Sequence, residues 1–160
     1  MKAGAISLFI TLLVAIAPLV VGAKNVPLRY TRRLPRIDKV ELQKVQSAEL
    51  GVRSVEEVKV VEGTQAEAIA ALWRSQNFRS LSPECHQPAY AIKFYARGKL
   101  LLYASLCWDC DNIDFIEPTL NASQGFNGSS RKGQALLALL RRSFPQLNNP
   151  PNKALQLTAR

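Results

Sequence analysis

A β-hairpin in the middle of the chain constrains the fold more than any other feature of the sequence. In residues 89–96 (AYAIKFYA), Tyr90, Ile92 and Phe94 would lie on one face of an extended strand. Residues 99–107 (KLLLYASLC) form a nearly continuous apolar run, which is typical of a strand buried on much of both faces. The dipeptide Arg97-Gly98 between them has the length of a two-residue hairpin turn. The chain therefore contains an antiparallel pair of strands.

Further strands and helices flank this hairpin. Strands are predicted over residues 39–45, 54–63 and 112–118, and helices over residues 64–78 and 131–144. The first helix opens with Thr64 and Glu67 at the spacing of a capping box. Strands joined by short turns favour an antiparallel sheet. The sequence thus predicts an α+β fold, an antiparallel sheet of about four to five strands with two helices packed on one face.

The hairpin register brings all three cysteines together. If Ala96 pairs with Lys99, residue numbers of opposite positions sum to 195. Cys107 then lies opposite position 88, and Cys110 lies opposite Cys85. His86, the single histidine, adjoins this thiol cluster of Cys85, Cys107 and Cys110.

Three interpretations of the thiol cluster are open. In an exported protein, Cys85 could form a structural disulfide with either Cys107 or Cys110. Alternatively, Cys85, His86, Cys107 and Cys110 supply four ligands that suit zinc or copper. The Cys-x-x-Cys pair could also exchange thiols and disulfides. Against exchange, the pair follows a strand rather than opening a helix, and Asp109 adjoins it, which raises a thiol pKa.

The two ends of the chain differ from its body. Residues 1–23 combine Lys2, an apolar run and small residues at positions 21–23, which is the pattern of a signal peptide cleaved after Ala23. An uncleaved membrane anchor is the alternative, because basic residues follow the run. The sequence then predicts a flexible basic segment over residues 24–36 and a single α+β domain over residues 37–146. Residues 147–160, rich in proline and asparagine, are predicted to be a disordered tail.

The positive charge lies in the flanks. Residues 24–48 carry a net charge of +5, residues 49–124 of −3 and residues 125–160 of +6. With Lys2 these sum to the formal net charge of +9. Because few aromatic residues accompany the basic ones, and because export is predicted, no nucleic-acid partner is expected. A weak electrostatic association with an anionic membrane or cell-wall surface is expected instead.

One more candidate binding site lies at the start of the second helix. Arg131 and Lys132 occupy a helix start, where anions are preferred, so a bound anion would compensate for them. The preceding glycines do not form a phosphate loop, since Gln134 stands where such a loop needs lysine. No catalytic residue is predicted, because the serines near the histidine, Ser105 among them, show no nucleophile motif.

Two family resemblances rest on quoted blocks of sequence. The blocks ALWRSQ, CHQPAYAIKFYARGKLL, CWDCDNI and GQALLALL resemble a group of small exported bacterial proteins that has no assigned activity. The last ten residues, PNKALQLTAR, resemble the tail that an integron gene cassette adds to a reading frame. The first resemblance implies an exported single domain, and the second implies a bacterial origin.

Taken together, these observations predict a small exported non-enzymatic protein that binds an unknown protein or ligand in the cell envelope. No cofactor is required by this hypothesis. The alternative hypothesis is a zinc- or copper-binding or thiol-redox envelope protein that uses Cys85, His86, Cys107 and Cys110.

Overall fold

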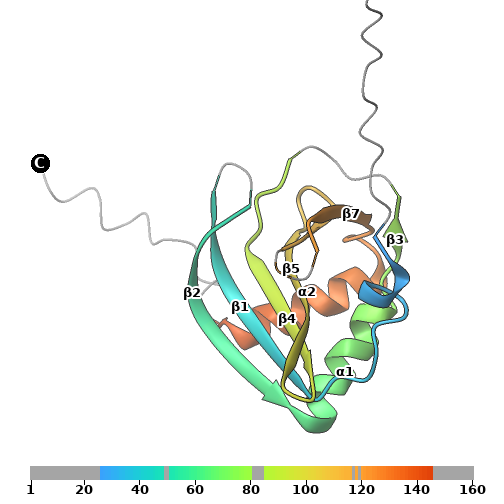
Figure 1. Ribbon diagram of the computed structural model, residues 1–160. Helices are drawn as coiled ribbons and strands as arrows, with labels where there is room; N and C mark the ends of the chain where they lie inside the picture. The colour runs from blue at the N-terminus through green and yellow to red at the C-terminus, as the bar shows by residue number, and fades with distance from the viewer. Residues whose placement is uncertain (1–25, 49–50, 81–84, 117, 119, 146–160) are drawn as a thin grey trace, which may run out of the picture.

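The fold is described by a computed structural model that covers residues 26–48, 51–80, 85–116, 118 and 120–145 (Figure 1). The predicted signal peptide and the predicted tail lie outside these residues. The elements, in chain order, are η1 (Leu28–Tyr30), β1 (Lys39–Ala48), β2 (Gly51–Glu62), α1 (Gly63–Arg74), β3 (Phe78–Arg79), β4 (Tyr90–Ala96), β5 (Lys99–Cys107), β6 (Asn112–Phe115), β7 (Ala122–Phe126) and α2 (Arg131–Ser143). None of the helices among the described residues is long and apolar enough to cross a membrane.

The strands form one antiparallel sheet in the order β2-β1-β4-β5-β6-β7-β3. This confirms the α+β class, but the predicted number of four to five strands is too low, since the sheet has seven. The two strands that the sequence did not indicate are β3 and β7. β3 has only two residues, and β7 (ASQGF) contains glycine and lacks alternating apolar residues, so neither carries a strand pattern.

The central hairpin forms where the sequence predicted it. Arg97 and Gly98 have φ angles of 52° and 72°, which is the left-handed conformation that the tight turn requires. Ala96 pairs with Lys99 as expected. A bulge then follows, so that Phe94 pairs with Leu102 and the register changes by one residue. Position 107 is therefore displaced by one residue from the predicted alignment.

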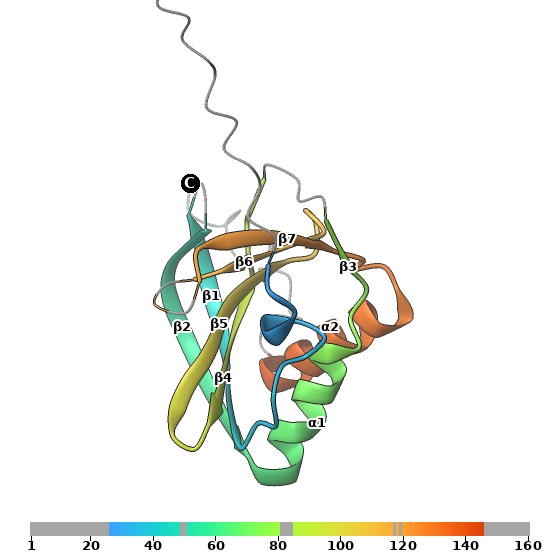
Figure 2. The same ribbon diagram turned by 45° about the vertical axis from the view of Figure 1, so that its right-hand side comes forward.

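Both helices pack on the same side of the sheet (Figure 2). Trp73 of α1 lies at the centre of this core and is completely buried. Its ring centroid lies 5.3 Å from that of Phe94 on β4 and 6.4 Å from that of Phe115 on β6. Leu136 and Leu140 of α2, and Phe144 just after it, join the same core. Alternate residues of β1, β4 and β5 face it. In β5 the residues between them are also partly or fully buried, as its nearly continuous apolar run predicted.

The segment before β1 is a packed part of the domain. The sequence predicts flexibility over residues 24–36, but residues 26–36 lie against the core, with Val26, Thr31 and Leu34 buried. The indole Nε1 of Trp73 donates a hydrogen bond to the carbonyl oxygen of Tyr30 at 2.9 Å. The prediction failed because the apolar anchors of this segment are too widely spaced to show a period.

Glu67 and Arg74 on α1 hold the end of this segment. Glu67 pairs with Arg74 and accepts a hydrogen bond from the backbone N–H of Ile37 at 2.8 Å. Arg74 donates to the carbonyl oxygens of Leu34 and Pro35, both at 3.1 Å. Burial raises the pKa of Glu67, but the hydrogen bonds from Ile37 and Arg74 outweigh it, so the net shift of the pKa is downward.

The two helices begin differently. The capping box predicted at Thr64 and Glu67 does not form, because α1 already begins at Gly63 and Glu67 bonds to the N-terminal segment. At α2 the start is as predicted. Ser130 is the N-cap residue, and its hydroxyl oxygen accepts from the backbone N–H of Gly133 at 3.0 Å.

Candidate functional site

The three cysteines converge where β5 ends, but they have different roles. Cys85, just before β4, forms a disulfide with Cys110, with 6.0 Å between their Cα atoms. Cys107 keeps a buried free thiol. Its sulfur accepts a hydrogen bond from the backbone N–H of Cys110 at 3.2 Å. Of the two pairings that the sequence left open, the structure contains the one between Cys85 and Cys110.

His86 lies in a buried chain of hydrogen bonds next to the disulfide. Its Nδ1 is 2.6 Å from Oδ1 of Asn112 on β6, and its Nε2 is 2.7 Å from the hydroxyl oxygen of Ser105 on β5. The Nδ2 group of Asn112 donates to the carbonyl oxygen of Cys85 at 2.5 Å. Because the amide nitrogen of Asn112 is used on Cys85, its Oδ1 accepts the hydrogen bond from Nδ1 of His86. A carboxylate oxygen of Asp114 lies 3.5 Å from Nε2.

The predicted metal ligands already take part in other bonds. Cys85 and Cys110 are bonded to each other, and both ring nitrogens of His86 have hydrogen-bond partners. Within the part of the chain that the structure describes, no group of three His, Cys, Asp or Glu side chains is arranged to hold a metal ion. The Cys-x-x-Cys motif is also divided, because Cys110 pairs with Cys85 rather than with Cys107.

The sequence interpretation missed the hydrogen-bonded series Ser105–His86–Asn112. It has the hydrogen-bond sequence of a nucleophile, a base and an orienting group. No local motif indicates it, because Ser105 lies inside a strand and meets His86 only when the loop before β4 folds over the sheet. Ser105 is 1% exposed, and His86 is 3% exposed. In this arrangement the three side chains hold the loop onto the sheet.

The predicted anion contacts, Arg131 and Lys132, line a cavity of about 510 Å³. Two further cations, Arg32 and Arg74, line the same cavity. The sequence interpretation missed them because Arg32 precedes β1 and Arg74 ends α1, far from α2 in the chain. The structure thus extends the predicted pair to four basic side chains.

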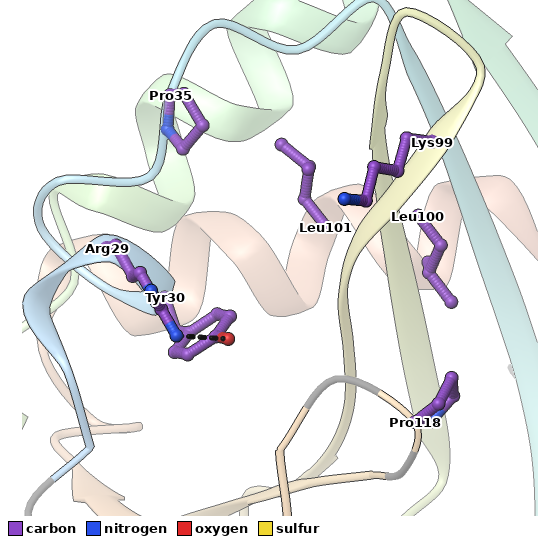
Figure 3. Close-up of a pocket in the computed structure, with 7 residues that line it drawn as sticks. All are labelled: Arg29, Tyr30, Pro35, Lys99, Leu100, Leu101 and Pro118. Atoms are coloured by element: carbon purple, nitrogen blue, oxygen red, sulfur yellow. Dashed lines mark hydrogen bonds between the residues drawn. The ribbon is translucent and has the colours of Figure 1, made fainter.

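A separate groove lies between the N-terminal segment and the tip of the central hairpin. Its first part, about 500 Å³, has Tyr30 and Pro35 on one wall and Leu101 and Lys99 on the other (Figure 3). Arg29 lies over the ring of Tyr30, with its guanidinium carbon 4.8 Å from the ring centroid. Figure 3 also shows Leu100 and Pro118 completing the lining.

A second hollow of about 550 Å³ adjoins the first, because Pro35 and Leu101 line both. Arg36, Asp38 and Arg97 lie on its rim. The carboxylate of Asp38 accepts a hydrogen bond from the backbone N–H of Arg97 at 2.5 Å. Across the two hollows there are four cationic side chains, counting Arg29 and Lys99, and one acidic side chain, which is a net charge of +3.

Comparison of the chain with protein-family models, with curated proteins and with solved structures found no match.

Proposed function

We propose that this is an exported, non-enzymatic binding protein of the bacterial cell envelope, which takes an amphiphilic anion in the groove shown in Figure 3. The observation that carries the proposal is the composition of the groove. Its walls are apolar side chains and prolines, while its rim has a net charge of +3. A ligand with an apolar body and an acidic group matches both properties.

Export is supported by two features. Residues 1–23 have the pattern of a signal peptide, and Cys85 and Cys110 form a disulfide, which persists in oxidising compartments. Fractionation of a bacterial host that expresses the full chain tests this part. We expect the protein in the periplasmic or secreted fraction with one free thiol, and a reduced cytoplasmic product would contradict export.

Ligand binding is tested with two probes that share a chain length and differ in charge. We expect decanoate to bind in calorimetry and decyltrimethylammonium to bind at least about tenfold more weakly, because the rim is positive. Lys99→Glu should weaken decanoate binding about tenfold. Lys59→Glu is the matched control, since Lys59 is an exposed lysine on β2. Equal binding of the two probes, or equal effects of the two variants, would refute the proposal.

A second candidate function is acyl transfer at Ser105. It is favoured by the order Ser105–His86–Asn112 and by a cavity of about 330 Å³ whose lining includes Ser105 and Asp114. A fluorophosphonate probe is the direct test. Labelling of Ser105 that disappears in His86→Asn would support this function. The burial of Ser105 favours the opposite result, no labelling of the folded protein.

A further inference from the structure

The basic cavity at the start of α2 is separate from the groove and has a different chemistry. Residues from the end of α1, the start of α2 and the segment before β1 line it. Its lining consists of Arg32, Arg74, Ser75, Gln76, Asn77, Ser130, Arg131 and Lys132. All these side chains are polar, so the cavity does not suit the apolar part of a ligand.

The charges around the cavity are not balanced by the protein. No acidic residue is among the lining residues, and the first turn of α2 has no acidic residue. Arg74 pairs with Glu67, but Arg32, Arg131 and Lys132 form no ion pair with another described residue. The N-terminus of α2 adds the positive end of the helix dipole to these three charges. Such an arrangement is stabilised when an anion occupies it.

Gln76 gives an independent indication of a ligand. Its side chain is 2% exposed, and its Nε2 donates to the carbonyl oxygens of Leu72 at 2.9 Å and Lys132 at 3.1 Å. These two bonds join α1 to α2 and fix the amide orientation. Its Oε1 is buried and has no hydrogen-bond partner among the described residues. A buried acceptor without a partner is uncommon in folded proteins. Gln76 is among the residues that line the cavity, so a ligand with a hydrogen-bond donor would satisfy this oxygen.

We propose that this cavity binds the phosphate group of a phosphorylated small molecule. A phosphate offers three acceptor oxygens and up to two negative charges, which suit several cationic donors better than one carboxylate does. When protonated, it also has a hydroxyl that can donate to Oε1 of Gln76. The volume of about 510 Å³ lies in the range of small-molecule sites, so the cavity also has room for the organic part of the ligand.

Inorganic phosphate is the first probe, titrated calorimetrically into the full oxidised chain. We expect saturable binding in the millimolar range or tighter. Arg131→Gln and Lys132→Gln should each weaken it about tenfold, the effect of removing one charge-assisted hydrogen bond. Arg142→Gln, in the last turn of the same helix, is the matched control and should change the affinity less than about twofold. Absence of saturable binding, or an equal loss in Arg142→Gln, overturns the proposal.

Sulfate is the second probe, because at pH 7.5 it has a charge close to that of phosphate but no proton to donate. We expect phosphate to bind several-fold more tightly than sulfate, and equal affinities would overturn the contact with Gln76. Lys99→Glu, which should weaken decanoate binding in the groove, should leave phosphate binding unchanged. The two proposals can therefore be refuted separately. The groove proposal fails if decanoate does not bind, and the cavity proposal fails if phosphate does not bind.

Discussion

The disulfide between Cys85 and Cys110 should supply a large part of the stability of this domain. The bridge spans a sequence separation of 25 residues. Closing a loop of this length lowers the entropy of the unfolded chain by about 12 cal/mol/K, which corresponds to about 3.5 kcal/mol at 25 °C. For a folded region of roughly 120 residues, removing the bridge and losing this stabilisation lowers Tm by about 14 °C. We expect both shifts in the double variant Cys85→Ala/Cys110→Ala.

Urea unfolding followed by circular dichroism measures the free energy, and a thermal scan measures Tm. Cys107→Ala is the matched control, because it removes a buried sulfur while leaving the bridge intact. This control should lose only about 1 kcal/mol. A reducing agent should lower the stability of the natural protein and leave the double variant unchanged.

The pairing itself is checked by peptide mapping without reduction. Cleavage before Asp109 separates Cys107 from Cys110, so the peptide linked to Cys85 identifies its partner. A link between Cys85 and Cys107 would refute the structure-based pairing. A loss of less than about 1 kcal/mol in the double variant would refute the entropy argument.

Three further predictions concern packing and charge. Gly133→Ala should destabilise the protein although alanine favours helices by about 1 kcal/mol, because the new Cβ would lie 2.6 Å from the carbonyl oxygen of Gly128. Glu67→Gln should lower stability at pH 7. The folded-state pKa of Glu67 lies below its ordinary value of 4.5, so this difference should disappear as the pH falls through that folded-state pKa. Ser105→Ala should cost about 1–3 kcal/mol, because it removes a partner of the buried His86 ring.

Urea titrations test all three, and each has a result that would count against it. Greater stability of Gly133→Ala would mean that the loop before α2 can move away from the helix. A pH-independent effect of Glu67→Gln would mean that the charge of Glu67 does not contribute. A neutral Ser105→Ala would mean that water replaces the hydroxyl without cost, and the chain of hydrogen bonds would not hold the loop.

Local pattern was enough to locate most of the elements. The Arg97-Gly98 turn, the two apolar strands beside it and the start of α2 at Arg131 were predicted because each depends on neighbouring residues. β7 was missed because its pairing with β6, rather than its own composition, makes it a strand. The segment before β1 was misjudged for a similar reason, since it is held by Trp73 and Glu67 from the following helix.

The candidate sites, too, were determined partly by local sequence and partly by the tertiary structure. The sequence determined that Cys85, Cys107 and Cys110 meet beside His86, because a hairpin turn fixes which positions lie opposite each other. Only the tertiary structure decided which cysteine pairs with Cys85, because the β4–β5 ladder ends at Tyr90 and Leu106, before it reaches any of the three cysteines. Likewise, Arg131 and Lys132 are visible as basic residues at a helix start, whereas their meeting with Arg32 depends on how two helices and a distant segment pack. Sequence patterns describe neighbours along the chain, and a binding cavity is made by neighbours in space.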